Sequence, residues 1–198
     1  MRRIALVFPL VLAAMQSACS PAGMAVGAAS TAGVAAVQER GFTGTLSDTK
    51  IKAAISEAYF KASEPIFLKV TVRVSEGRAM LLGGLADQAL HDRAVQLAWA
   101  QAGVKQVIDE LQAVEGGVGD YARDTWITAQ INAKLTFDEI VLPINYSVDT
   151  VGGVVYLMGI AQDQRELDRV IDHANDVRHV KRVVSHVVLK DDPGREGS

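Results

Sequence analysis

The chain has 198 residues, which leaves room for one large domain or two small ones. Its formal net charge of -3 argues against a general nucleic-acid binder, because such a protein needs a basic surface to neutralise phosphates. Its single cysteine excludes an intramolecular disulfide and a metal site built from several cysteines. Because aromatic residues make up only 6% of the chain, any core is mostly aliphatic.

Residues 1–18 have the layout of a bacterial export signal. Two arginines precede an apolar run from Ile4 to Met15, and small residues follow. The run is shorter than the roughly 20 residues that a membrane-spanning helix needs. Cys19 follows directly, and the junction resembles the lipobox of bacterial lipoproteins, with Gln16 where an aliphatic residue is usual. We therefore interpret Cys19 as a lipidation site; the alternative is an ordinary secretory signal with a free cysteine near the cleavage point.

Residues 19–45 are rich in Ala, Gly, Ser and Thr, a composition that predicts a flexible tether between the lipid anchor and the folded part.

The rest of the chain repeats itself with a shift of 76 residues. Matching residues recur in register over some sixty positions, among them Ile51 with Ile127, Ile55 with Ile131, Leu81 with Leu157 and Gly83 with Gly159. The repeat predicts two copies of one domain, at residues 46–115 and 121–190, and a disordered tail at 191–198.

Each copy has the same pattern of predicted elements, in the order α-β-β-α-β. We expect an α+β fold in which a three-stranded mixed sheet packs under two helices. The first helix is expected to be capped by Ser47 or Asp48 in copy one and by Asp124 in copy two. Gly83 and Gly159 end the second strand of each copy, and we interpret them as structural glycines that provide a positive φ or a close helix–sheet approach.

The first helix of copy two, within Asp124–Phe137, has two apolar stripes. Ile127, Ile131 and Leu135 form the stripe that a helix buries in its own domain. A second stripe lies roughly a quarter-turn away and consists of Trp126, Gln130, Ala133 and Phe137. It fits an interfacial membrane contact, and packing on a neighbouring domain explains it equally well.

Copy one carries charged residues on the same face of its first helix. Lys50, Glu57 and Lys61 stand where copy two has Trp126, Ala133 and Phe137. Copy two is therefore the expected binding module and copy one the scaffold.

The ends of the second strands and the starts of the last strands resemble those of the BON domain. The residues that carry this resemblance are Leu81-Leu82-Gly83 with Val104-Lys105-Gln106-Val107, and Leu157-Met158-Gly159 with Val180-Lys181-Arg182-Val183. With the export signal, the chain is similar to dual BON-domain lipoproteins of the Gram-negative outer membrane. That resemblance implies a periplasm-facing lipoprotein that binds anionic phospholipids (phosphatidylglycerol and cardiolipin) and supports envelope integrity. It also implies links to the division site and the outer-membrane β-barrel assembly machinery.

The expected phospholipid-binding residues are Arg123, Trp126, Gln130, Ala133, Lys134 and Phe137. Arg123 and Lys134 are expected to meet phosphate, whereas Asp138 and Glu139 are expected to oppose an anionic surface. Two alternatives stay open: an adaptor that docks on an envelope assembly through the same face, and a stress-type periplasmic chaperone without an anchor. No catalytic motif occurs, and we expect no enzyme activity, cofactor or metal.

Overall fold

The computed structural model describes residues 41–113 and 118–195; Cys19 and residues 19–40 of the expected tether lie outside them. The first copy consists of α2 (Gly41–Ala62), α3 (Glu64–Lys69), β1 (Val70–Ser75), β2 (Arg78–Gly84), α4 (Gln88–Trp99) and β3 (Gln106–Gln112). The second consists of α5 (Val118–Thr136), η3 (Pro143–Asn145), β4 (Tyr146–Val151), β5 (Val154–Ala161), α6 (Gln164–Asn175) and β6 (Arg182–Leu189), followed by η4 (Pro193–Arg195).

Both sheets are mixed. In each copy the first two strands are antiparallel and the second and third are parallel, with the second strand in the centre. The expected α+β fold with a three-stranded mixed sheet in each copy is confirmed. Copy one has α3 as an additional short helix, begun by the Ser63 cap and Pro65.

Each copy has its own aliphatic core between helices and sheet. Ile51, Ile55 and Leu81 belong to the first core, and their counterparts Ile127, Ile131 and Leu157 belong to the second. These side chains are at most 7% exposed, so the apolar stripe of each first helix is buried as its spacing predicts.

The expected caps at Asp48 and Asp124 are wrong, because α2 and α5 begin earlier, at Gly41 and Val118. Residues 41–45 are therefore helical rather than part of a tether. Both aspartates are buried and hold the turn between the first two strands of their own copy. Asp48 accepts hydrogen bonds from the N–H groups of Glu76 (2.9 Å) and Gly77 (3.0 Å). Asp124 does the same for Gly152 (2.6 Å) and Gly153 (2.9 Å).

Gly83 and Gly159 lie where the central strand passes very close to the start of its antiparallel neighbour. Their φ angles are +135° and +153°, a region of backbone conformation that residues other than glycine rarely adopt. A Cβ at these positions would lie 2.0 Å from the carbonyl oxygen of Lys69 and 2.1 Å from that of Asn145. The close approach is thus to the backbone of the residue just before the neighbouring strand, which is the last residue of α3 in copy one and of η3 in copy two.

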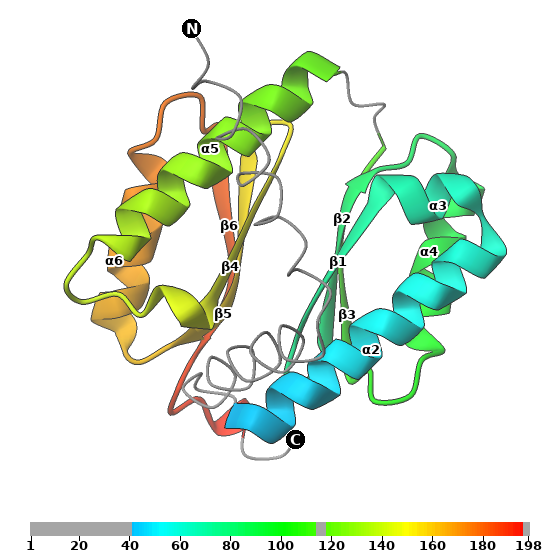
Figure 1. Cartoon of the computed structure of the whole chain (residues 1–198), viewed down its shortest axis with the longest axis horizontal. Coiled ribbons are helices and arrows are strands. Elements are labelled where there is room, and N and C mark those ends of the chain that lie inside the picture. The colour runs from blue at the N-terminus through cyan, green and yellow to red at the C-terminus, as the bar shows by residue number, and fades with distance from the viewer. Residues whose placement is uncertain (1–40, 114–117, 196–198) are drawn as a thin grey trace, which may run out of the picture.

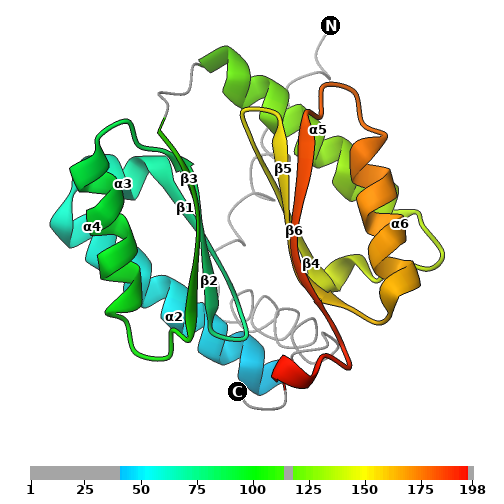
Figure 2. The same ribbon diagram turned by 180° about the vertical axis from the view of Figure 1, so that it is seen from behind.

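The two sheets face each other, and the helices lie outside them, so the molecule has four layers (Figures 1 and 2). A third apolar cluster joins the facing sheets, with Met80, Leu82 and Ile108 from copy one and Tyr156 and Met158 from copy two. Each central strand is therefore buried on both sides, which explains its nearly continuous apolar sequence.

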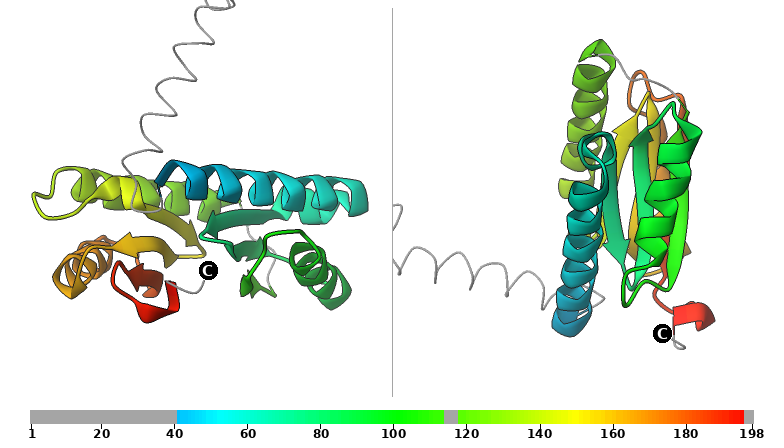
Figure 3. Two further views of the ribbon diagram at one scale, coloured as in Figure 1. Left: turned by 90° about the horizontal axis from the view of Figure 1, so that it is seen from below. Right: turned by 90° about the vertical axis from the view of Figure 1, so that its right-hand side faces the viewer.

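Figure 3 shows α2 and α5 along one side of the molecule and α4 and α6 along the opposite side.

The expected disordered tail at the C-terminus is partly ordered. Residues 193–195 form η4, and the guanidinium of Arg195 pairs with the Glu76 carboxylate at 2.8 Å. This ion pair joins the end of copy two to the β1–β2 turn of copy one.

Candidate functional site

Helix α5 places three of the expected binding residues, Trp126, Gln130 and Ala133, on its outward side. Ile127, Ile131 and Leu135 are buried at 1% exposure or less. Gln130 and Ala133 are exposed. At about 100° per residue, the Trp126 stripe lies more than a quarter-turn from the core stripe, so it points away from the sheet.

Trp126 is half exposed, at 43%, and contacts its own domain. Its ring meets that of His179 edge-on, with centroids 6.1 Å apart and an interplanar angle of 66°. The α5 residues that line the groove toward copy one are different ones: Tyr121, Asp124, Thr125, Thr128, Ala129 and Asn132. The interpretation that the Trp126 stripe packs on the neighbouring domain is therefore wrong for the residues that the structure describes.

Phe137 is 87% exposed and lies just after the end of α5. Two further large apolar side chains follow it in the loop, Ile140 at 42% and Leu142 at 44% exposure. We call Phe137, Ile140 and Leu142 the apolar corner. The sequence reasoning missed its last two members, although an apolar triplet at 140–142 between Glu139 and Pro143 was a visible signal.

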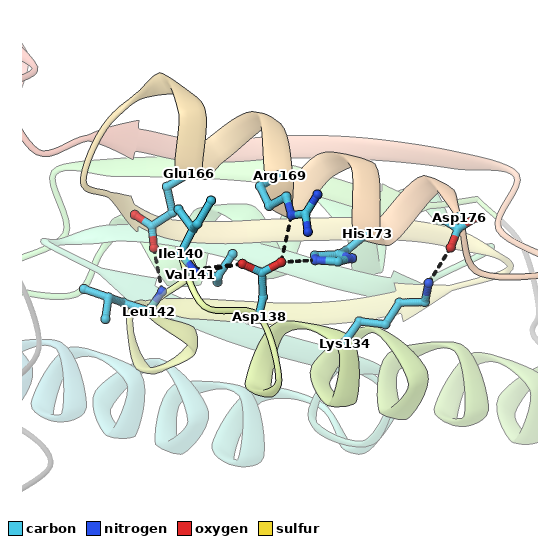
Figure 4. Close-up of polar contacts among 9 residues, drawn as sticks. All are labelled: Lys134, Asp138, Ile140, Val141, Leu142, Glu166, Arg169, His173 and Asp176. Carbon is cyan, nitrogen blue, oxygen red and sulfur yellow. Dashed lines mark hydrogen bonds and ion pairs between the residues drawn. The ribbon is translucent and has the colours of Figure 1, made fainter.

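The Asp138 carboxylate fixes the backbone of the apolar corner (Figure 4). It accepts hydrogen bonds from the N–H groups of Ile140 (2.9 Å) and Val141 (3.3 Å). Nε2 of His173 lies 2.6 Å from the same carboxylate, and Nε of Arg169 donates to it at 2.7 Å. The His173 bond, with those from Ile140 and Arg169, holds the pKa of Asp138 well below its usual range.

These contacts also correct the expected role of Asp138 at an anionic surface. Its side chain is only 3% exposed and faces α6, where Arg169 forms an ion pair with it and His173 lies within hydrogen-bond distance. Asp138 therefore does not present a negative charge to a ligand on the outward side.

Glu166 fixes the far end of the same loop from α6 (Figure 4). One of its carboxylate oxygens accepts a hydrogen bond from the N–H of Leu142 at 2.7 Å, and the other from the N–H of Gln162 at 2.6 Å. Copy one has Ala62, Leu90 and Leu97 at the positions of Asp138, Glu166 and His173. The polar support of the loop is thus specific to copy two.

The two expected phosphate contacts have different surroundings. Lys134 forms an ion pair with Asp176 that joins α5 to α6 and lowers the pKa of Asp176 (Figure 4). Arg123 is exposed and lines a cavity of about 300 Å³ together with Gly152, Gly153 and residues 179–181. Of the two cations, Arg123 is the one that lines this cavity.

Neither a metal cluster nor a membrane-crossing helix accompanies this surface. Within residues 41–113 and 118–195, no group of His, Cys, Asp and Glu side chains could hold a metal ion. No helix in the same ranges is long and apolar enough to cross a bilayer.

The sequence profile of the BON domain matches twice, at residues 47–115 and 123–191. The chain belongs to the BON-domain family. It is 42% identical over 147 residues to an uncharacterised protein of Anaplasma centrale, a match that covers 73% of this chain and 96% of that protein. It is 33% identical to osmotically-inducible protein Y of Escherichia coli, over 73% of this chain and 74% of that one. It is 27% identical to the outer membrane lipoprotein DolP of Haemophilus influenzae, over 72% and 75% of the two chains.

Proposed function

We propose that the protein is an outer-membrane lipoprotein, anchored through Cys19 and facing the periplasm, whose second BON domain binds anionic phospholipid and supports envelope integrity. The export signal and Cys19 support the anchor, as does the likeness to a protein named as an outer membrane lipoprotein. The observation that carries the binding proposal is the exposed apolar surface of α5 and its following loop, held on a rigid polar support.

The magnitudes favour a weak, composite membrane contact. Trp126 and the apolar corner together supply a few kcal/mol when partly buried, at about 25 cal/mol per Å². Each basic side chain near an anionic surface adds about 1 kcal/mol. Neither contribution is large alone, so stable attachment depends on the lipid anchor. The contact is salt-sensitive, because charges are screened over about 8–10 Å at physiological ionic strength.

The place where α2 begins supports the proposed attachment to the membrane. Gly41 begins α2, which lies on the same side of the molecule as α5 (Figure 3). The first helix that the structure describes therefore lies on the same side as the helix that carries the proposed binding surface.

Vesicle flotation tests this proposal. We use the chain from residue 19 onward with Cys19→Ala, which lacks the export signal and acylation but keeps every residue described by the structure. It should float with phosphatidylglycerol or cardiolipin vesicles and not with phosphatidylcholine vesicles. Trp126→Glu and Phe137→Ser should each reduce flotation at least fivefold.

The matched control is Phe60→Ser in copy one. Phe60 is 68% exposed and contacts the ring of Phe67, so it is a comparable exposed aromatic residue outside the proposed surface. Its replacement should leave flotation unchanged. If Trp126→Glu and Phe137→Ser float as well as the parent chain, α5 is not the lipid site.

That negative result would favour the adaptor function. In that case the Trp126 surface docks on a protein such as the outer-membrane β-barrel assembly machinery. Trp126 suits this alternative, because tryptophan is among the residues that most often dominate the binding energy of protein interfaces.

A further inference from the structure

The α6–β6 loop of copy two carries an unusual concentration of positive charge beside the N-terminal half of α5 (Figure 1). Residues 178–182 read Arg-His-Val-Lys-Arg, whereas the equivalent residues 102–106 of copy one read Ala-Gly-Val-Lys-Gln. The protein as a whole is acidic, at -3. This loop is therefore a local basic patch that the net charge conceals.

The loop is one wall of the cavity that Arg123 lines. His179 and Lys181 contribute to the lining from this wall, and Gly152 and Gly153 contribute from the β4–β5 turn. Lys181 is held in place, since its Nζ donates to the carbonyl oxygen of Gly152 at 2.7 Å. Arg123, His179 and Lys181 thus line one cavity of about 300 Å³.

We infer that this cavity binds a phosphate group, either the phosphodiester of a lipid headgroup or a soluble phosphate ester. Arginine and lysine are the usual partners of phosphate oxygens, through charge-assisted hydrogen bonds. In the described part of the chain, the carboxylate that bonds to the turn is that of Asp124, which is buried and already accepts the Gly152 and Gly153 N–H groups.

Copy one shows that the backbone of this cavity does not require the basic residues. Its turn and loop meet in the same way, since the N–H of Lys105 donates to the carbonyl oxygen of Gly77 at 2.9 Å and that of Lys181 to Gly153 at 2.8 Å. The lining nevertheless differs at three positions. Copy one has Ser47, Glu76 and Gly103 in place of Arg123, Gly152 and His179. The scaffold is shared, and the positive charge is an addition of copy two.

Trp126 connects the cavity to the proposed membrane surface. Its ring lies against His179, so an anion in the cavity sits next to a half-exposed indole. This arrangement would place the bound phosphate at headgroup depth, where interfacial tryptophans also lie. The inference rests on the proposed function only for the lipid as the source of the phosphate.

The test uses the emission of Trp126 in the Cys19→Ala chain from residue 19, with Trp99→Phe so that one indole remains. Titration with glycerol phosphate or inorganic phosphate should give a saturable change in emission, and sodium chloride at matched ionic strength should not. Phosphatidylglycerol flotation of the same protein should fall when excess glycerol phosphate is added.

Gly152→Glu is the decisive variant, because copy one has Glu76 at the same position with nearly the same backbone angle. The φ angles are +61° at Gly152 and +55° at Glu76, and a Cβ at Gly152 has only an ordinary contact at 3.5 Å. Gly152→Glu should weaken phosphate binding at least tenfold, and Arg123→Ser at least fivefold. Gly152→Gln has the same size without the charge, and Arg178→Gln removes a charge next to the cavity; both should stay within threefold of the parent.

The outcomes separate the two proposals. Unchanged phosphate affinity in Gly152→Glu and Arg123→Ser, or an equal response to sodium chloride, overturns the cavity as a phosphate site. Flotation of the parent chain without any saturable phosphate response leaves the proposed function standing and rejects this inference. Saturable phosphate binding that is lost in Gly152→Glu, without flotation of the parent chain, supports the cavity and rejects the lipid as its source.

Discussion

Arg73 and Asp149 occupy the same position in the two copies, 76 residues apart, and their side chains bond to each other across the interface. The guanidinium donates twice to the carboxylate, at 2.7 Å and 2.6 Å. Glu110 and His186 are likewise 76 residues apart and meet at 2.8 Å. Residues that contact their own counterparts lie near a two-fold axis, so the two copies pack like the subunits of a symmetric dimer.

Charge reversal at Arg73 and Asp149 tests this arrangement. Arg73→Asp and Asp149→Arg each place like charges opposite one another and should destabilise the protein by about 1–3 kcal/mol, since the pair is bidentate and partly buried. The double variant restores opposite charges and should recover most of the loss. Thermal unfolding of the four proteins gives the coupling free energy; purely additive losses would mean that the two side chains do not interact in solution.

Ile131→Asp should unfold the second domain, because it buries a charge in the aliphatic core at a cost of several kcal/mol. Trp126→Ala should cost less than about 1 kcal/mol, because the indole is half exposed and lies outside the aliphatic core. Chemical denaturation followed by circular dichroism measures both. A loss for Trp126→Ala as large as that for Ile131→Asp would place the indole in the core.

Asp138 should contribute stability that depends on pH. Its pKa is lowered in the folded state by His173, the Ile140 N–H and Arg169, relative to about 3.9 in the unfolded chain. A lowered pKa contributes stability that is fully present above about pH 4 and disappears as the pH falls toward the folded-state value. Asp138→Asn should therefore be less stable than the parent at pH 7, and the difference should shrink below pH 4.

Urea unfolding at pH 7 and pH 3 measures this difference. The control is Glu139→Gln, which removes a neighbouring exposed carboxylate and should have little effect at either pH. An Asp138→Asn deficit that is equally large at pH 3 and pH 7 would show that the carboxylate charge is not what stabilises the loop.

Gly159→Ala should be strongly destabilising, by several kcal/mol, because its Cβ would lie 2.1 Å from a backbone oxygen that cannot move without disrupting β4. Gly152→Ala also has a positive φ but meets only an ordinary contact at 3.5 Å, and should cost about 1 kcal/mol. Melting temperatures of the two variants measure the comparison. Equal losses would indicate that the positive φ alone, and not the close approach, determines the cost.

The repeat and the buried stripes were predictable from the sequence, because they depend on local spacing. The stripe Ile127, Ile131 and Leu135 predicts both the helix and its buried side. Asp48 and Asp124 were misread because an aspartate near a helix start has the same local sequence whether it caps the helix or bonds a turn 28 residues away.

The support of the apolar corner was not predictable in this way. Asp138 meets Arg169 and His173 only after α6 has folded back along α5, and no local pattern encodes that contact. The interface between the sheets did leave a signal, since Met80, Leu81 and Leu82 form a continuous apolar run where a strand with one wet face would alternate. The basic loop at 178–182 could also have been found, by comparing the two copies outside their first helices.

The two carboxylates behind the apolar corner have a consequence for the kinetics of binding. Asp138 and Glu166 hold the loop backbone in one conformation, so Ile140 and Leu142 are exposed without the loop being free to rearrange. A surface that is already ordered loses little conformational entropy when it meets a partner. Its association should therefore be a single diffusional step without a slow folding phase, and substitutions on the surface should act mainly by shortening the lifetime of the complex.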